Sequence, residues 1–178
     1  MPTYVAFLRA INLGATRRFP TNRVVAATEA AGGRGVATYL ATGNVRLDSR
    51  RRSAEAVAAA LEQAYLAETG FEVTTVVLTA AEVAEVVATA DRLAAEQGPP
   101  RTQALMLYVD PPDAEAVARV DVPPPDRLFV DGRVAHLFLD GGFQGARWMG
   151  TRAFADLGVG TSRTLNVVRE VSRRWCGG

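Results

Sequence analysis

The stretch "TYVAFLRAINLGATRRFPTNRVVAATEAAGG", residues 3–33, places one strand, one connection and one helix in a fixed order. Its apolar start, residues 3–11, predicts a strand that is buried on both faces, because consecutive strand side chains point to opposite sides of a sheet. Pro20 then predicts a helix to about Ala31, ended by Gly32 and Gly33, since proline favours the first turn of a helix and glycine its end. This stretch therefore predicts a β–α unit.

The remainder of the first half adds two strands, a helix and a fourth strand. "ATYLA" and "VRLD" flank Thr42–Asn44, which predicts a tight glycine turn between two strands. Ser53 is a good N-cap residue, and apolar residues follow it at helical spacing. "VTTVVLT" (73–79) is rich in β-branched residues, and Thr79 with Glu82 fits a capping box for the next helix.

The second half repeats this order of elements. "QALMLYV" (103–109) predicts a strand, and Asp113 predicts the start of a helix. Asp131–Gly132 lies between two apolar segments and is a strong hairpin signal. Residues 150–158 predict a short helix, 161–164 a short strand, and "LNVVREVSRRW" a terminal helix.

Both halves therefore have the order β-α-β-β-α-β followed by a helix, which is the order of the ferredoxin-like unit. The predicted fold class is α+β, with two tandem ferredoxin-like repeats. Residues 1–97 form the first predicted repeat, and residues 98–178 form the second with its C-terminal helix. "EQGPPRT" (96–102) is the predicted join between them.

The composition excludes several classes of protein. The chain has 178 residues, 48% of them hydrophobic, and a net charge of +1, which is typical of a globular protein that buries a core. Its apolar runs are too short to span a membrane, and its single cysteine favours a cytoplasmic location. The low charge, the aromatic content of 7% and the lack of an RNA-recognition motif argue against a nucleic-acid partner. No lysine is present, so Schiff-base chemistry and a P-loop lysine are excluded.

Metal and catalytic motifs are not recognisable in the sequence. His136 is the only histidine and Cys176 the only cysteine, and they form no zinc-binding spacing. No serine lies in a G-x-S-x-G motif. The segments "GGRG" (32–35) and "DGGFQG" (140–145) fit flexible turns better than dinucleotide or phosphate fingerprints. We therefore predict no metal and no cofactor, and catalytic residues remain unknown.

Arginines near the first strand-to-helix connection suggest anion binding. Arg9, Arg17 and Arg18 surround this connection, and Asn12 and Asn44 are candidates for neutral hydrogen bonds nearby. The planar guanidinium group suits phosphate or carboxylate. Composition alone nevertheless favours the simpler interpretation, in which these arginines are solvated or paired with acidic residues.

Four segments together resemble the bacterial family DUF1697. "TYVAFLRAINLG" (3–14) and "TYLATGNV" (38–45) are similar to its N-terminal signature, approximately Y-V-A-F-L-R-A-I-N-L-G-G and T-Y-I-Q-S-G-N-V. "DGGFQGARWMGTRAFADLG" (140–158) is similar to its glycine-rich segment, and "TSRTLNVV" (161–168) to its C-terminal motif. The resemblance implies two ferredoxin-like repeats but no settled activity.

The resemblance also carries motif residues onto this chain, and the positions that match are Arg9, Asn12, Gly14, Gly43, Asn44, Arg163 and Asn166. Thr42 replaces the motif serine but keeps a hydroxyl, and Arg147 replaces a lysine but keeps its charge. The motif residues Ser, Asn, Trp and Thr are replaced by Ala146, Thr164, Leu165 and Val167. Arg17 and Arg18 lie outside the signature.

Three functional hypotheses follow. In the first, the protein binds a small anionic ligand at a site between the repeats, through Arg9, Asn12, Gly14, Thr42, Gly43, Asn44, Arg147, Arg163 and Asn166. In the second, it is a nucleic-acid or protein interaction module that uses an exposed sheet face. In the third, it is a structural member of the family that has lost its activity. The substrate, any reaction and the oligomeric state do not follow from the sequence.

Overall fold

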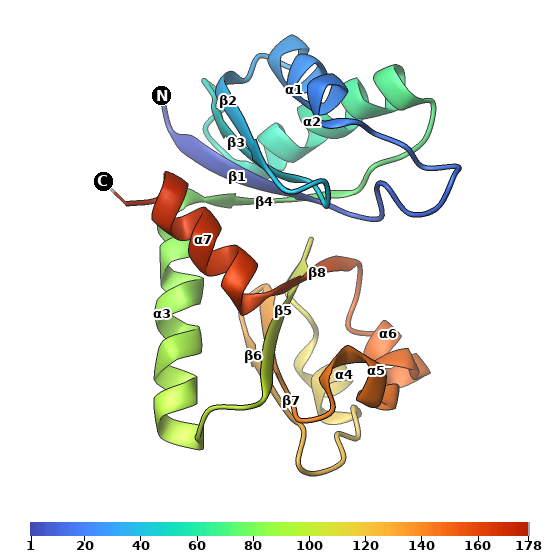
Figure 1. The fold of residues 1–178 in the computed structure, drawn as a ribbon, viewed down its shortest axis with the longest axis vertical. Coiled ribbons are helices and arrows are strands. Elements are labelled where there is room, and N and C mark those ends of the chain that lie inside the picture. Colours follow the sequence, from blue (N-terminus) through green and yellow to red (C-terminus); the bar gives the residue numbers. More distant parts are fainter. Residues whose placement is uncertain (178) are drawn as a thin grey trace. The chain divides into compact units, whose positions relative to one another are not determined.

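The computed structural model describes residues 1–177, which form two compact units (Figure 1). One unit comprises Met1–Ala84 and the C-terminal segment from Val171, and the other comprises Glu85–Glu170. Element order predicts a boundary at 97/98, whereas packing divides the chain within the helix that precedes it. One contact between this helix and the second unit is the hydrogen bond from Gln103 Nε2 to the Ala90 carbonyl (3.0 Å).

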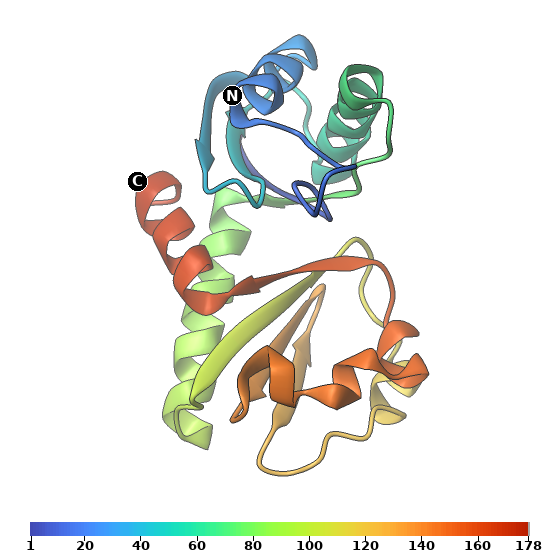
Figure 2. The same cartoon turned by 45° about the vertical axis from the view of Figure 1, so that its right-hand side comes forward.

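The first unit contains one four-stranded sheet and two helices on one side of it (Figures 1 and 2). Its elements are β1 (Thr3–Leu8), α1 (Thr21–Ala30), β2 (Arg34–Tyr39), β3 (Asn44–Asp48), α2 (Ala54–Thr69) and β4 (Thr75–Thr79). The strand order is β2-β3-β1-β4, and all neighbours are antiparallel. Ala6, in the middle of β1, pairs with Val45 and Val77.

The core of the first unit lies between the sheet and its two helices. Leu8 of β1 packs in one cluster with Val24 of α1 and Leu61 of α2. Tyr65 makes an edge-on contact with Phe19 (5.1 Å between ring centroids), and its hydroxyl lies 2.8 Å from Thr28 Oγ1. Burial raises the pKa of Tyr65 to about 12, so this hydroxyl stays protonated and acts as a neutral hydrogen-bonding group.

The second unit contains another four-stranded sheet with the corresponding strand order. After α3 (Ala80–Gln97), its elements are β5 (Thr102–Tyr108), α4 (Ala114–Ala118), β6 (Arg127–Asp131), β7 (Val134–Leu139), α5 (Gly142–Gly145), the 3-10 helix η1 (Arg147–Gly150), α6 (Arg152–Ala155), β8 (Gly160–Thr164) and α7 (Leu165–Trp175). The order is β6-β7-β5-β8, again antiparallel throughout. The chain is thus an α+β protein with two four-stranded antiparallel sheets, consistent with two tandem repeats.

Both faces of the second sheet are covered by helical segments. The segments α4, η1 and α6 cover one face, where Trp148 and Phe154 pack in a cluster with Leu137. Helix α3 lies along the other face (Figure 1), and Arg169 of α7 forms an ion pair with Asp91 of α3. The four-residue segments η1 and α6 are fixed by the packing of Trp148 and Phe154, because such short segments have little helical stability of their own.

The local signals in the sequence are confirmed at several element ends. Ser53 caps α2 by accepting a hydrogen bond from the Ala56 amide (3.1 Å). Thr79 and Glu82 form the predicted capping box, with the Thr79 amide donating to Glu82 Oε2 (2.7 Å) and the Glu82 amide to Thr79 Oγ1 (3.1 Å). Asp113 caps the short helix α4.

Three predicted elements differ from the structure. The strand predicted over 3–11 ends at Leu8, because the backbone turns into the left-handed region at Ala10 (φ 54°). The first hairpin is wider than predicted, since β2 ends at Tyr39 and β3 begins at Asn44. The single helix predicted over 150–158 is shorter, α6, and two further short segments precede it.

Candidate functional site

The connection between β1 and α1 is a compact loop built around Asn12. Three of its residues have positive φ, namely Ala10 (54°), Asn12 (55°) and Gly14 (65°), and the Asn12 amide donates to the Arg17 carbonyl (2.7 Å). Asn12 Oδ1 accepts a hydrogen bond from the Phe19 amide (2.9 Å), and Nδ2 donates to the Phe19 carbonyl (3.1 Å). The side chain of Asn12 therefore closes the loop on itself.

Asn12 also joins this loop to the β2–β3 hairpin. Its second Nδ2 hydrogen bond reaches the Ala41 carbonyl (2.7 Å), 29 residues along the chain. With these three contacts both amide hydrogens and one oxygen lone pair of Asn12 are used, so the side chain has little capacity left for a ligand. Asn12 is consequently a residue that positions the loop.

Arg17, which lies outside the family signature, braces the same loop from the other side. Its Nε donates to the Ala10 carbonyl (2.7 Å) and its Nη2 to the Glu72 carbonyl (2.6 Å), and the guanidinium lies over the Phe71 ring (4.6 Å from Cζ to the ring centroid). Nothing in the local sequence distinguishes it from Arg18, because its partner Glu72 is 55 residues away. Sequence reasoning therefore missed the role of Arg17.

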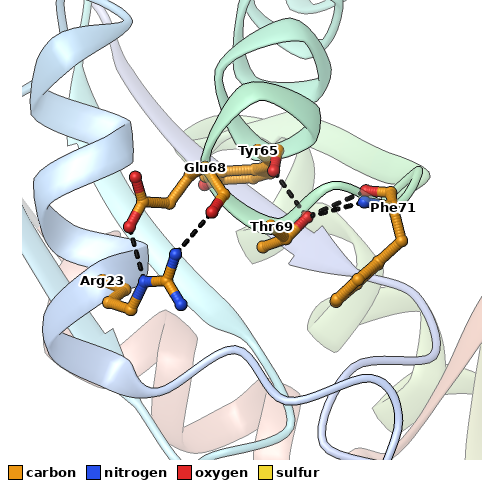
Figure 3. Close-up of polar contacts among 5 residues, drawn as sticks. All are labelled: Arg23, Tyr65, Glu68, Thr69 and Phe71. Atoms are coloured by element: carbon orange, nitrogen blue, oxygen red, sulfur yellow. Dashed lines mark hydrogen bonds and ion pairs between the residues drawn. The ribbon is translucent and has the colours of Figure 1, made fainter.

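Figure 3 shows the polar contacts at the end of α2, which precedes Phe71. Thr69, at the end of α2, accepts a hydrogen bond from the Phe71 amide (3.2 Å), and its hydroxyl lies 2.7 Å from the Tyr65 carbonyl. At the preceding residue, Glu68, the Arg23 guanidinium of α1 bonds both to the carboxylate and to the backbone carbonyl. The end of α2 is thus held to α1 and presents Phe71 to Arg17.

The hairpin that meets the Asn12 loop requires glycine at position 43. Gly43 has a φ of 83°, and a Cβ there would lie 2.7 Å from Leu8 Cβ and 2.9 Å from Ile11 Cδ1. Its carbonyl accepts a hydrogen bond from the Leu8 amide (2.8 Å), at the end of β1. Gly43 therefore allows the hairpin to approach β1 closely, as well as completing the turn.

Asn44 and Thr42 lie on either side of this glycine. Asn44 is fully buried, and its Nδ2 donates to the Tyr39 carbonyl (2.7 Å) and, more weakly, to Thr42 Oγ1 (3.3 Å). Asn44 pairs with Phe7 across β1 and β3. The structure thus brings Asn12, Thr42, Gly43 and Asn44 together at one end of the first sheet, chiefly through contacts that hold its loops.

Arg9 is the charged residue at this end of the sheet. It follows β1 directly, its backbone amide donates to the Thr74 carbonyl (2.9 Å), and its side chain is exposed. Within residues 1–177, its guanidinium has no hydrogen-bond or ion-pair partner. Alternation continued from β1 places Arg9 on the same face as Phe7, and hence as Asn44. Arg9 is therefore available to a ligand, in contrast to Arg17.

The predicted residues of the second unit lie in different environments. Arg163 of β8 is only 8% exposed, and its Nη1 donates to Thr161 Oγ1 (2.9 Å) and to the Ser162 carbonyl (2.7 Å). Burial lowers the pKa of Arg163 to about 10, so it still carries its charge at neutral pH. Arg147 and Asn166 are exposed, on η1 and α7.

Arg147 and Arg163 lie on opposite faces of the second sheet. Arg163 pairs with Leu105, which points away from the face where Ala104 packs. Arg147 precedes Trp148, which packs in the same cluster as Ala104. Within this unit, the structure therefore does not bring these two arginines together.

His136 is buried in β7 with no partner for Nδ1 among the residues described. Burial lowers its pKa to about 4, opposed by Asp131 and assisted by Arg92, so the imidazole is neutral at pH 7. Among residues 1–177, no three His, Cys, Asp or Glu side chains group as metal ligands. None of the helices described there combines the length and the apolar composition that a bilayer crossing requires.

The geometry defines an α+β protein with two similar antiparallel sheets and a loop-and-hairpin junction at one end of the first. The chain belongs to the family "Protein of unknown function (DUF1697)", whose family model matches residues 1–136. A search of curated proteins finds no match. The fold is similar to that of the conserved bacterial protein SP0830 from Streptococcus pneumoniae, at 15% sequence identity, with 98% of each chain covered and a TM-score of 0.75.

Proposed function

We propose that this protein binds a small anionic ligand, bearing phosphate or carboxylate, and that Arg9 contacts the anionic group. The observation that carries the proposal is the exposed Arg9 guanidinium, which has no partner in the described chain. It lies next to a loop that Asn12 and Arg17 hold through hydrogen bonds to residues seven or more positions away in the sequence. A rigid neighbourhood lowers the entropy lost when Arg9 engages a ligand. Arginine can then offer two parallel N–H groups to a carboxylate or phosphate.

The other predicted residues take different parts in this proposal. Asn12, Gly14 and Gly43 set the backbone of the loop and hairpin, while Thr42 and Asn44 flank the same end of the sheet. Arg147 and Asn166 are exposed in the second unit, and their contacts to a ligand stay predictions. Arg163 is proposed to contribute its charge, because its Nη1 is already engaged within β8.

We also propose that each repeat is a ferredoxin-like unit. The strand orders β2-β3-β1-β4 and β6-β7-β5-β8 support this, because each sheet places its first and third strands in the centre. A cytoplasmic location is proposed on the single cysteine, which cannot form a disulfide within the chain.

An interaction module with an open sheet face is the weaker hypothesis. From Tyr4 to Leu8, β1 buries both alternating sets of side chains, and every residue of β7 is buried. An RNA-binding sheet needs exposed aromatic side chains on such central strands. The burial of β1 and β7 therefore favours the ligand-binding proposal.

Thermal unfolding with a panel of probes tests the proposal. Inorganic phosphate, pyrophosphate, citrate and AMP would each be titrated into the full chain, where a bound ligand at about 100 times its Kd stabilises the fold by about 2.7 kcal/mol. Arg9→Gln should abolish the rise in Tm. Arg18→Gln is the matched control, since Arg18 is exposed in the same loop and likewise lacks a partner among the described residues.

Two outcomes would contradict the proposal. One is that no probe raises the Tm of the wild-type protein. The other is that Arg9→Gln and Arg18→Gln weaken the effect equally, because a loss that depends only on net charge indicates diffuse attraction. Parallel measurements on Arg147→Gln and Asn166→Ala test the contributions that the sequence predicts for these residues.

A further inference from the structure

A surface pocket lies between the end of α1 and the start of β2. It has a volume of about 390 Å³ and is lined by Glu29, Gly32, Gly33, Arg34 and Gly35. Arg34 pairs with Asp48, the last residue of β3, whereas the Arg9 end of the sheet lies near Asn44, the first. The pocket is therefore at the opposite end of the first sheet from Arg9, and an inference about it does not depend on the function proposed above.

Positive charge is concentrated in the segment of sequence that begins at this pocket. Residues 34–52 contain five arginines and one acidic residue, Asp48, although the whole chain has a net charge of only +1. Arg34, Arg50 and Arg52 are exposed, and their side chains have no hydrogen-bond or ion-pair partner within residues 1–177. Such a local excess of charge attracts anions, and guanidinium groups bind phosphate with directed hydrogen bonds.

The other two arginines of this group hold the pocket wall. Arg51 Nη1 donates to the Ala31 carbonyl (2.9 Å). Arg46 Nη1 donates to the Gly35 carbonyl (2.6 Å), while its Nη2 forms an ion pair with Asp48 (2.8 Å). The pocket wall is therefore held by Arg46 and Arg51, whose guanidinium groups bond to its backbone carbonyls.

The backbone that carries Arg34 has an irregular and closely packed conformation. The register of β2 and β3 shifts between Arg34 and Ala37, which is the mark of a bulge, and Gly35 has a φ of 54°. A Cβ on Gly35 would lie 2.3 Å from Arg46 Nη1. Bulges change the direction of the neighbouring side chain and are frequent beside binding sites. Arg34 thus pairs with Asp48 and stands beside the pocket where the irregular part of β2 begins.

We propose that this pocket binds a small phosphate-bearing molecule, with Arg34 contacting the phosphate. Arg50 and Arg52, which flank Arg51 in the sequence, add to the positive charge of this segment, and Glu29 accepts a hydrogen bond from a hydroxyl or amino group of the same molecule. The volume falls in the range of small-molecule sites, about 300–1,000 Å³. Binding of a nucleic-acid backbone would instead depend on the exposed Arg50 and Arg52 rather than on the pocket.

Pyrophosphate titration, followed by amide NMR of the isotope-labelled full chain, tests this site. The amide signals of Gly32, Gly33 and Gly35 should shift with a single Kd. Arg34→Gln should weaken binding by about tenfold, the loss expected for one charge-assisted hydrogen bond. Arg101→Gln is the matched control, since Arg101 is another exposed arginine without a partner in the described chain. Its Kd should equal that of the wild type.

Several results would overturn the proposal. One is the absence of NMR shifts at the three glycines, and another is an equal loss of affinity in Arg34→Gln and Arg101→Gln. A third is the loss of the glycine shifts in Arg9→Gln, which would place the phosphate at the other end of the sheet. Two further arms use a single-stranded oligonucleotide and vesicles containing phosphatidylglycerol. Binding to either that survives Arg34→Gln but is lost in Arg50→Gln/Arg52→Gln would replace the small molecule with a polyanion or a membrane surface.

Discussion

Acidification should destabilise this protein through one residue, His136. Its side chain lies in β7 at 1% exposure, and Nδ1 has no partner within the described residues. The residues paired with His136 on the two neighbouring strands, Phe129 and Leu105, are apolar. Arg163, which pairs with Leu105 on the next strand, lies on the same face of the sheet. Because a buried imidazolium would be poorly solvated, its pKa in the folded protein falls to about 4; Asp131 opposes this shift and Arg92 adds to it.

The size and the sign of the effect follow from this pKa. In the unfolded chain the imidazole has its ordinary pKa of about 6.5, so the unfolded state takes up a proton first as the pH falls. Stability contributed by neutral His136 is therefore complete above about pH 7 and decreases below it. Proton linkage gives a loss of about 2 kcal/mol at about pH 5, and of about 3 kcal/mol below about pH 4, where the folded state is protonated too.

Two measurements check this prediction. His136 is the only histidine, so its ring proton resonance gives the folded-state pKa without assignment ambiguity, and it should not titrate above about pH 5. Urea unfolding at about pH 8 and about pH 5 would then be compared between the wild type and His136→Gln, which has no titrating group at this position. The difference between the two proteins should change by about 2 kcal/mol with pH. A resonance that titrates near its ordinary pKa, or a difference that is independent of pH, would refute the reasoning.

Two further predictions concern the junction of the Asn12 loop and the hairpin. Gly43→Ala should reduce the free energy of unfolding by about 2 kcal/mol or more, because the new Cβ would overlap Leu8 and Ile11 and the backbone there is left-handed. Urea unfolding measures this change, and a reduction below about 0.5 kcal/mol would contradict the prediction. Asn12→Ala removes three side-chain hydrogen bonds and should accelerate hydrogen exchange at the Phe19 amide, whereas equal exchange rates in the two proteins would show that the loop holds itself.

Much of the fold was predictable because its signals are local. Ser53 and the Thr79–Glu82 pair mark helix starts through contacts three residues apart, and these are confirmed. The end of β1 was not predictable in this way. The apolar pattern continues to Ile11, and the turn at Ala10 is stabilised by Arg17, which is in turn held by Glu72. No short window of sequence contains that information.

The candidate site was predictable as a region and less so in its roles. The signature residues Asn12, Gly43 and Asn44 do meet at one end of the first sheet, yet their amides and backbone are used to hold loops together. A motif records which residues a structure needs, and it does not separate contacts to a ligand from contacts that shape the site. Arg17 shows the converse, since a residue outside the motif performs the same bracing.

The arginines of this chain differ in their hydrogen-bond partners, which the composition does not reveal. Composition treats all basic residues alike and thus favours solvated or ion-paired side chains for every one. In the structure, Arg17, Arg46 and Arg51 donate hydrogen bonds to backbone carbonyls. Replacing them would leave these carbonyls without their donors. The side chains of Arg9 and Arg34 lack such partners in the described chain, although an irregular backbone directly follows each of them, at Ala10 and Gly35. An arginine that is free while its surroundings are held can bind an anion without first giving up a contact, and this is why the two proposals rest on Arg9 and Arg34.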